Sequence, residues 1–398
     1  MSVPKRPRGA GGAVPRAVIG VVAAAFVHGA TASAPARADA VMLRSGETIF
    51  GTVEAMDSGS LALRRAVDRN AVRPAASDVP AAQVADRIGW DRIASIECED
   101  GTGRWPDVER FLAAGERLWR ARTRLERGDA TLAGRAIEGS WTPMTADGPT
   151  AAVAAMVELQ VALASRDQAR AVAAHFEALR LRRRGFDAPS LVEWLEPAPN
   201  GAFVRRPVVD SSTPLCPLLP PFARSDEQRI EMLAALDHFD VRGDAELDEL
   251  RLAFAAAVDP TRAAPEAPRS AARGADRGEE QDSQRTLDFL RALREARSAD
   301  PAERRRGADA IAQMRRRLPE WSEAWGRFAV GCGLLLDATP ESVIDAQLEL
   351  LHLPARFSES QPFLAPLAAS MAAQASVADG RVDEAPRIAP VQPPTEPR

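Results

Sequence analysis

The chain of 398 residues contains one lysine, no tyrosine and two asparagines. The lysine is Lys5, close to the N-terminus. A phosphate-binding loop of the Walker A type requires a lysine, and so does Schiff-base chemistry. Both are therefore excluded for the chain beyond Lys5. Neither Asn70 nor Asn200 begins an Asn-x-Ser/Thr sequence, so the chain has no acceptor for N-glycosylation.

The first forty residues have the pattern of a secretion signal. Basic residues come first, and the apolar stretch AVIGVVAAAFVHGA follows them. This stretch is shorter than the ~20 apolar residues that cross a bilayer. A small-x-small sequence predicts cleavage between Ala40 and Val41, whereas the earlier site at Ala34 is disfavoured by the proline that follows it. We expect a signal peptide over 1–40 and export to the periplasm or envelope, with an uncleaved anchor as the alternative.

The charge of the chain argues against nucleic acid as a partner. The formal net charge is −5. Residues 1–40 hold five basic residues and one acidic residue, so the chain without them carries a net charge of −9. A negative field repels nucleic acid and anionic membranes. We therefore expect no nucleic-acid partner. Because the only long apolar stretch belongs to the signal, we also expect no integral membrane span after the signal is cleaved.

Only three cysteines occur, Cys98, Cys216 and Cys332, and their spacing is not that of a metal site. The odd count leaves at least one of them unpaired. Cys332 lies in the apolar stretch FAVGCGLLL, which favours a buried, inert thiol. Export permits disulfides, so a Cys98–Cys216 bridge is one possible state of the other two.

Residues 41–99 predict a small β domain. VMLRSGETIFGTVEAMDSGSLALRR, which starts at Val41, contains three runs of alternating apolar residues separated by two glycine-containing turns. RIGWDRIASIEC then supplies apolar residues for a further strand. Four or five short, bent strands in so few residues are typical of a closed SH3-like or Sm-like barrel.

The first hairpin resembles the first motif of the Sm family. The matching positions are Leu43, Gly46, Gly51, Val53 and Asp57. In that family an asparagine shortly after the aspartate contacts RNA, but no asparagine follows Asp57 here, and the later Arg-Gly loop is replaced by GWDRIAS. The resemblance thus implies the barrel without its RNA-binding residues. It also implies a second possibility, self-assembly through strand edges.

The rest of the chain predicts helical hairpins. Apolar residues recur with the period of a helix over 104–195, 225–259 and 284–385. LERGDATLA and LASRDQARA align at an offset of 38 residues, and VADGRVDEA repeats the pattern near the C-terminus. These turns resemble those of tetratricopeptide-like helix pairs. The resulting fold class is α+β, mostly α, with a small N-terminal barrel followed by TPR-like hairpins.

Three proline-containing segments interrupt or end the helical part. Residues 196–224 also carry large apolar side chains, so we predict an ordered strap across the helices. Residues 260–283 have almost no large apolar side chain and predict a disordered linker, as does the tail 386–398. The strap is our candidate interaction site because functional residues concentrate on irregular segments. Its candidate residues are Arg206, Cys216, Pro220, Pro221 and Phe222.

Other candidates for chemistry have simpler structural interpretations. ALDHFDVRGDAELDEL gathers carboxylates around His238, but one histidine among loosely spaced acids favours a solvated turn with an aspartate N-cap. We expect His175 to be half-buried at the surface, His352 to lie near a helix end, and the arginines of RLRRR to face solvent. The tryptophans at Trp105, Trp119, Trp141, Trp194, Trp321 and Trp325 are expected to fill helix-pair cores.

Taken together, these patterns predict a non-enzymatic exported adaptor that binds an unknown protein partner and needs no cofactor. The alternative is an enzyme with a thiol near Cys216, activated by a basic neighbour such as Arg206.

Overall fold

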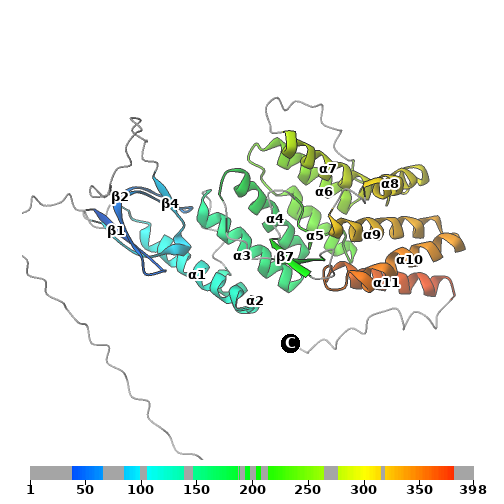
Figure 1. The fold of residues 1–398 in the computed structure, drawn as a ribbon, viewed down its shortest axis with the longest axis horizontal. Coiled ribbons are helices and arrows are strands. Elements are labelled where there is room, and N and C mark those ends of the chain that lie inside the picture. The colour runs from blue at the N-terminus through cyan, green and yellow to red at the C-terminus, as the bar shows by residue number, and fades with distance from the viewer. Residues whose placement is uncertain are drawn as a thin grey trace, which may run out of the picture. The chain divides into compact units, whose positions relative to one another are not determined.

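The computed structural model describes most of the chain after the predicted signal peptide. The described residues are 38–65, 85–98, 105–138, 147–186, 188, 193–197, 203–207, 214–263, 277–314 and 319–380, with the backbone alone described for 193–197, 203–207, 277–282 and 320. They form an N-terminal antiparallel sheet followed by helices (Figure 1). The predicted α+β, mostly helical class is confirmed. The predicted tail and most of the predicted linker lie outside the described residues.

The sheet has five strands in the order β4-β3-β2-β1-β5. The strands are β1 (Asp39–Leu43), β2 (Thr48–Met56), β3 (Leu61–Arg65), β4 (Asp86–Ile88) and β5 (Ile93–Glu97). In β2, Ile49 and Val53 are buried and their neighbours along the strand are exposed, as the alternation predicted. The turn between β2 and β3 is fixed by the Asp57 carboxylate, which accepts hydrogen bonds from Gly59 N and Ser60 N, each at 2.8 Å.

The prediction of a closed barrel is wrong. The sheet is open, with β4 and β5 as its two edges. Helix α1 (Val108–Glu126) covers the buried face instead, where Val108 joins the core of the sheet and the Phe111 ring lies 5.2 Å from the Trp90 ring. Because the helix removes these apolar side chains from water, the sheet needs no closure to bury them.

A buried tryptophan joins the sheet to the helices. Trp90 lies in the short 3₁₀ helix η1 (Trp90–Arg92), where its indole Nε1 donates to Asp57 O at 2.8 Å and its backbone N donates to Thr150 Oγ1 at 2.9 Å. Next to it, the buried Asp91 pairs with Arg122 at 3.0 Å. The sheet region at 41–99 therefore shares its core with the start of α1 and is bonded to α3 through Thr150.

Two helical hairpins follow the sheet. They consist of α1, α2 (Ala130–Ile137), α3 (Pro149–Ser165) and α4 (Gln168–Arg183). The two aligned sequence turns have equivalent roles, since Asp129 caps α2 by accepting from Leu132 N at 3.0 Å and Asp167 caps α4 by accepting from Arg170 N at 3.0 Å. The third copy of the pattern begins at the end of α11 and continues beyond the described residues.

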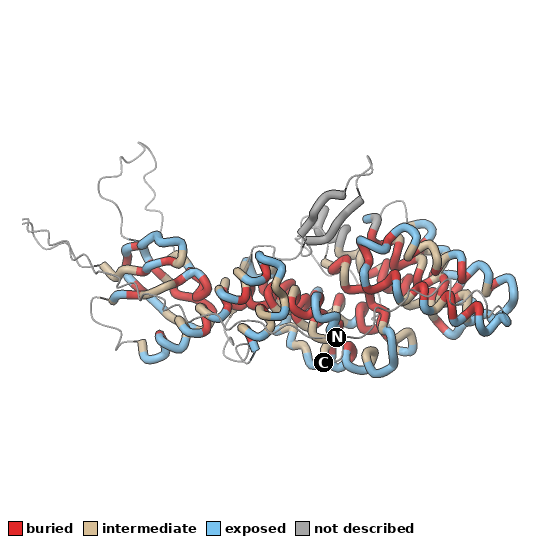
Figure 2. The backbone as a smooth tube through the Cα atoms, turned by 90° about the horizontal axis from the view of Figure 1, so that it is seen from below, coloured by how far each residue is buried: buried red, intermediate tan, exposed pale blue. Residues whose placement is uncertain are grey.

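Seven further helices follow in the described residues, and consecutive helices pack on one another through buried faces (Figure 2). They are α5 (Asp226–Asp237), α6 (Ala245–Val258), α7 (Arg277–Glu295), α8 (Pro301–Met314), α9 (Glu320–Asp337), α10 (Pro340–Arg356) and α11 (Leu364–Ala378). One boundary differs from the sequence analysis, because helix α7 begins within the predicted linker. Helix α10 continues through Pro354, where burial of its apolar face outweighs the local preference of proline.

The segment between α4 and α5 contains a hairpin of β6 (Glu193–Pro197) and β7 (Phe203–Pro207). Residues 214–224, the last part of the predicted strap 196–224, then cross the helices. From here on the name strap refers to 214–224. His175 Nε2 lies 3.1 Å from Pro214 O, and Gln361 Nε2 donates to Pro217 O at 3.1 Å. The Phe222 ring lies 4.5 Å from the Phe328 ring of α9. The strap thus connects α4 with α9 and with the residues just before α11.

Candidate binding groove

A groove lies between α3, α4 and the end of α5, with a volume of about 480 Å³. It is lined by Ala151, Ala154, Glu158, Arg170, Ala173, Ala174, Glu177, Ala235, His238, Phe239, Asp240 and Arg242. This volume falls in the range of small-molecule and peptide sites.

The floor of the groove is made of alanines. Ala151, Ala154 and Ala174 are buried, whereas Ala173 and Ala235 are half-buried. Small side chains allow α3 and α4 to pack closely and leave the space above them open. The Phe239 ring forms an apolar wall and is held by the Phe176 ring at a centroid distance of 5.8 Å. The floor therefore offers shape and apolar contact and carries no charge.

One end of the groove is closed by an ion pair between α3 and α4. Arg170 Nη2 donates to Glu158 Oε2 at 2.8 Å, and its Nε donates to Oε1 of the same carboxylate. This two-point geometry is the strongest form of arginine–carboxylate contact. The hydrogen bonds that Arg170 donates to the Glu158 carboxylate raise the pKa of Arg170. The Arg170 side chain is 39% exposed and that of Glu158 is 13% exposed, so the guanidinium faces the groove more openly.

The other end of the groove is lined by Glu177, Asp240 and Arg242, and Arg242 belongs to a cluster of three arginines around Asp147. Asp147 accepts hydrogen bonds from Arg180 at 2.8 and 3.0 Å, from Arg242 at 2.6 Å, and from Arg184. Arg180 also donates to Glu177, at 2.6 and 2.8 Å. The Arg180 hydrogen bond lowers the pKa of Asp147. These contacts tie the start of α3 to the end of α4 and to the turn between α5 and α6.

The acidic run around His238 forms no single site. His238 Nδ1 lies 2.6 Å from Ala234 O at the end of α5. Asp237 pairs with Arg262 at 2.9 Å, and Asp244 caps α6 by accepting from Leu247 N at 3.0 Å. The expectation of an aspartate N-cap is confirmed. Across the described residues, no group of three or more His, Cys, Asp or Glu side chains is placed to hold a metal ion.

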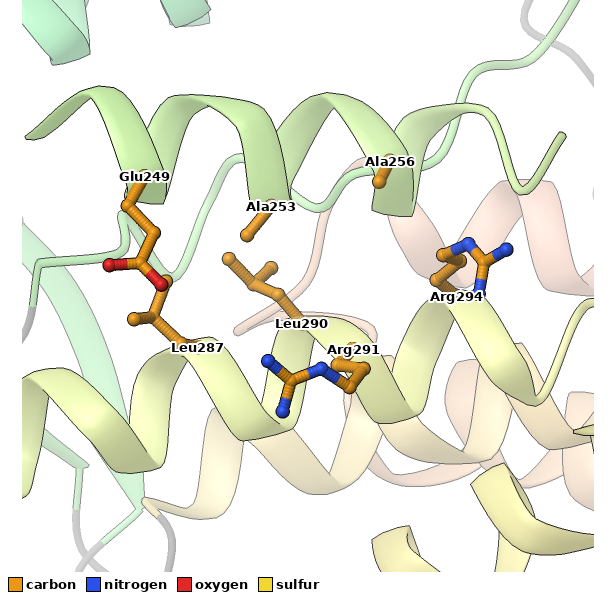
Figure 3. A pocket seen from close by; sticks show the side chains of 7 residues that line it. All are labelled: Glu249, Ala253, Ala256, Leu287, Leu290, Arg291 and Arg294. Atoms are coloured by element: carbon orange, nitrogen blue, oxygen red, sulfur yellow. The ribbon is translucent and has the colours of Figure 1, made fainter. Parts of the chain in front are cut away.

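A second, enclosed cavity lies between α6 and α7 (Figure 3). It is lined by Glu249, Ala253, Ala256, Leu287, Leu290, Arg291 and Arg294. Its volume of about 10 Å³ is at the lower limit for a single water molecule. Burial raises the pKa of the Glu249 carboxyl. The cavity has no room for a ligand, so the groove is the stronger candidate.

Cys216 does not form an accessible thiol site, whereas Cys98 and Cys332, of which the second was expected to be buried, are half-buried. Cys216 is a free, buried thiol, so the possible Cys98–Cys216 bridge does not form. Burial raises the pKa of Cys216 to about 12 and that of Cys332 to about 11. Arg206 lies on β7, where only its backbone pairing with Trp194 is described. A thiolate at Cys216 is therefore strongly disfavoured at neutral pH.

The other candidate residues of the strap are also internal. Pro220, Pro221 and Phe222 are buried, like Cys216. Arg297 lies over the Phe222 ring at 5.0 Å and covers it from solvent. In the folded chain these side chains contact its own helices and are not displayed at the surface.

One histidine and one arginine differ from expectation, whereas His352 lies near a helix end as expected. His175 is buried instead of half-buried, and burial lowers its pKa to about 4. His352 lies inside α10, one turn before its end, with Nε2 3.9 Å from Glu323 Oε1. Arg180, expected to face solvent, is only 1% exposed. The expectation for Trp321 and Trp325 is confirmed, because both fill the core under α9.

The predicted cleavage site falls inside β1. Ala40 pairs with Phe50 of β2 and with Glu97 of β5, and Val41 is fully buried. One residue earlier, Asp39 Oδ2 accepts a hydrogen bond from Val53 N at 2.8 Å. Cleavage before Val41 would remove this contact and shorten the strand by two residues.

The sequence analysis did not predict the groove. At one end, the paired residues Arg242 and Asp147 are separated by 95 positions, so no local pattern connects them. At the other end, a local signal for the ion pair was available. Glu158 and Arg170 lie on opposite sides of the Ser165-Arg166-Asp167 turn, where an antiparallel hairpin brings such positions together.

Comparisons with known proteins do not indicate a function, so the functional proposal is based on the geometry of the groove. No family model, no curated protein and no solved structure matches the chain. Within the described ranges, no helix combines the length and apolar composition needed to cross a bilayer.

Proposed function

We propose that this chain is an exported, non-enzymatic adaptor that binds a segment of a protein partner in the groove between α3, α4 and α5. The observation that carries the proposal is the groove itself, an open hollow of about 480 Å³ with an uncharged floor and ion pairs at both ends. Helix-lined grooves of this kind are a common means of peptide recognition. The signal-like N-terminus supports export.

The thiol-enzyme alternative receives less support. A catalytic cysteine is expected to be partly exposed, with a lowered pKa. Cys216 has the opposite properties, because it is buried and its pKa is raised to about 12. His175 is the histidine that contacts the strap, and it could serve a thiol enzyme as a base. Its Nε2 contacts Pro214 O, and no described contact joins it to a thiol. The adaptor proposal therefore places recognition on the groove and gives the strap a structural role.

Site-specific photocrosslinking in the native host tests the proposal. The crosslinking amino acid is placed at Ala173 or Ala235, both half-buried in the groove, and at the exposed Ala113 of α1 as the matched control. We expect a discrete adduct from the two groove positions and none from Ala113. A second substitution, Ala173→Trp, fills the groove and should abolish the adduct formed from Ala235.

Two results would contradict the proposal. Adducts of equal strength from Ala113 and Ala235 would mean that contact is unspecific. An Ala235 adduct that persists in the Ala173→Trp variant would place the partner outside the groove. Point variants are preferable to deletion of the sheet, because the sheet packs against α1 and Trp90 N donates to Thr150 Oγ1 of α3.

A further inference from the structure

We propose that α10 is the contact surface of a symmetric dimer, in which α10 of one chain packs antiparallel on α10 of a second copy. The residues involved are different from those that line the groove, so the dimer does not depend on the proposed function. Three features of α10 support it, namely an exposed apolar stripe, neighbours that leave this stripe uncovered, and the order of the charges beside it.

Helix α10 has a second apolar face, opposite the one that it buries. The buried face includes Ala346, Leu350 and Leu353, each at 0% exposure. The other face carries apolar side chains at intervals of four, three and four residues, which is the spacing of a coiled-coil seam. This stripe consists of Ile344, Leu348, Leu351 and Ala355. Ile344 is 49% exposed and Leu348 is 66% exposed, so the stripe leaves large apolar side chains in water.

The neighbouring helices pack on the two sides of α10 and leave the stripe open. Figure 1 shows α10 between α9 and α11. On the α9 side, Arg327 donates to Glu349 at 2.6 Å, and on the α11 side, Gln347 donates to Ser376 at 2.9 Å. The stripe lies between these contacts and is about 17 Å long, at 1.5 Å per residue. Its three turns match one helix laid along it.

Charged side chains lie along one flank of the stripe, and their sign changes along the helix. On the flank next to α9, Glu341 and Asp345 occupy the first half of α10, whereas His352 and Arg356 occupy the second half. Asp345 and Arg356 are both exposed. The opposite flank has no charged side chain and is formed by Pro340, Gln347 and Pro354. The stripe therefore has a negative half and a positive half on one side only.

The remaining charges of this flank lie further from the stripe and are paired within the chain. Arg327 of α9 pairs with Glu323 at 2.9 Å and with Glu349 at 2.6 Å. Glu323 also lies 3.7 Å from Arg356 and 3.9 Å from His352. Glu323 and Arg327 are only 13% and 16% exposed. These pairs do not change the order of the exposed charges, which is negative at Asp345 and positive at Arg356.

An antiparallel second copy matches both the stripe and the charges. In that arrangement Leu348 meets Leu351 of the second copy, and Ile344 meets the small Ala355 of the second copy. Asp345 then lies beside Arg356 of the second copy, and the twofold axis repeats this contact. A parallel pair would instead place Asp345 beside its own equivalent, where like charges repel. Flanking charges of this kind set the orientation of paired helices.

The first experiment measures the mass of the chain by sedimentation velocity at protein concentrations from about 1 to 200 μM. The protein runs from residue 38 onward and so contains all described residues. Since three turns per chain make a small interface, we expect a Kd in the micromolar range and a shift from one chain to two. Leu348→Glu should weaken the dimer at least about tenfold. Ile230→Glu is the matched control, because Ile230 of α5 is 60% exposed, and it should leave the dimer unchanged.

The second experiment exchanges the charges between two chains. Asp345→Arg and Arg356→Glu should each weaken self-association about fivefold, because both symmetric contacts then join like charges. A mixture of the two variants should regain the wild-type affinity within about twofold, since opposite charges meet again at both contacts. Arg356 lies near Glu323, so the fold of Arg356→Glu is checked by circular dichroism. If that variant is unfolded, Leu348→Glu and Asp345→Arg decide.

Four results would overturn the inference. A single-chain mass for the wild type at every concentration excludes the dimer. If Ile388→Ser then associates, the stripe is covered by the segment after α11 of the same chain. A dimer that survives both Leu348→Glu and Asp345→Arg uses another surface. Tighter association of Asp345→Arg with the wild type than of the wild type with itself makes the pair parallel. None of these results affects the groove, which the Ala173 and Ala235 crosslinks test separately.

Discussion

Arg180 donates two hydrogen bonds to Asp147, at 2.8 and 3.0 Å, from a side chain that is only 1% exposed. A buried guanidinium without a carboxylate would carry a large desolvation cost. Asp147 and Glu177 together offset that cost, and Asp147 also receives Arg184 and Arg242. The pair is therefore the point at which α3, α4 and the α5–α6 turn are held in register around the groove.

Asp147→Asn should destabilise the chain by about 2–3 kcal/mol, because it leaves the buried Arg180 with one carboxylate instead of two. The measurement is the free energy of unfolding in urea. Asp240→Asn is the control, and it should change that free energy by less than about 0.5 kcal/mol because its side chain is well exposed. Equal effects of the two substitutions would show that the Asp147 cluster does not stabilise the fold.

His175 should make the chain less stable as the pH falls from about 6.5 toward 4. Burial lowers the pKa of His175 from 6.5 to about 4, so within this window the unfolded chain binds a proton that the folded chain does not. Stability thus rises with pH across the window. The full effect is about 3 kcal/mol.

The check is urea unfolding at several pH values for the wild type and for His175→Gln. The substituted chain should lose this part of the pH dependence. His238→Gln, at an exposed position, should keep it. A wild-type pH profile that His175→Gln does not flatten would contradict the assignment.

Gly115→Ala should separate α1 from the sheet. A Cβ at Gly115 would overlap the backbone carbonyl of Trp90, which cannot move without breaking its contacts to Asp57 and Thr150. We expect a loss of about 1–3 kcal/mol and a change in tryptophan fluorescence. Gly134→Ala is the control, because its new Cβ would meet only the Val161 side chain. A smaller loss at Gly115 than at Gly134 would refute this account of the junction.

Cys216 should resist thiol reagents at neutral pH while the chain is folded. Its burial and raised pKa leave almost no accessible thiolate. Labelling followed by mass spectrometry should find Cys216 modified at least about a hundredfold faster in denaturant than in buffer. Rapid modification of the folded chain would instead favour the thiol-enzyme alternative.

We expect the chain to be exported and to begin at Val41 after cleavage of its signal. Fractionation of the native host followed by N-terminal sequencing checks both the location and the cleavage site. Because cleavage there removes Asp39 and its bond to Val53 N, a chain that starts at Val41 should be about 1 kcal/mol less stable than one that starts at Ala38. Recovery of the uncleaved chain in the membrane fraction would favour the anchor alternative.

Local patterns predicted the elements of this fold well, and contacts between distant segments account for the differences. The alternation of Ile49 and Val53 identified β2, and the Asp129 and Asp167 turns identified two hairpins. These signals lie within a few residues of one another. Closure of the sheet could not be predicted in the same way, because it depends on α1 covering the buried face.

Helix α4 shows the same limit for the candidate site. His175 and Arg180 follow the polar pattern of a surface helix, yet both are buried. The reason is that α3, α5 and the strap all pack against α4, so it has little exposed face left. The strap contributes Pro214 from 39 positions away, and no periodicity within α4 encodes that contact.

The bond between Gln361 and Pro217 joins positions 144 residues apart. In a helical solenoid each repeat touches only its neighbours, so the array can unfold stepwise from an end, like a zipper. A strap that contacts both early and late helices removes that freedom, because the last helices cannot detach without exposing the strap's apolar side chains. The helical part should therefore unfold in a single cooperative transition. It should also fold slowly for its size, since the contact between Gln361 and Pro217 closes a long loop of chain.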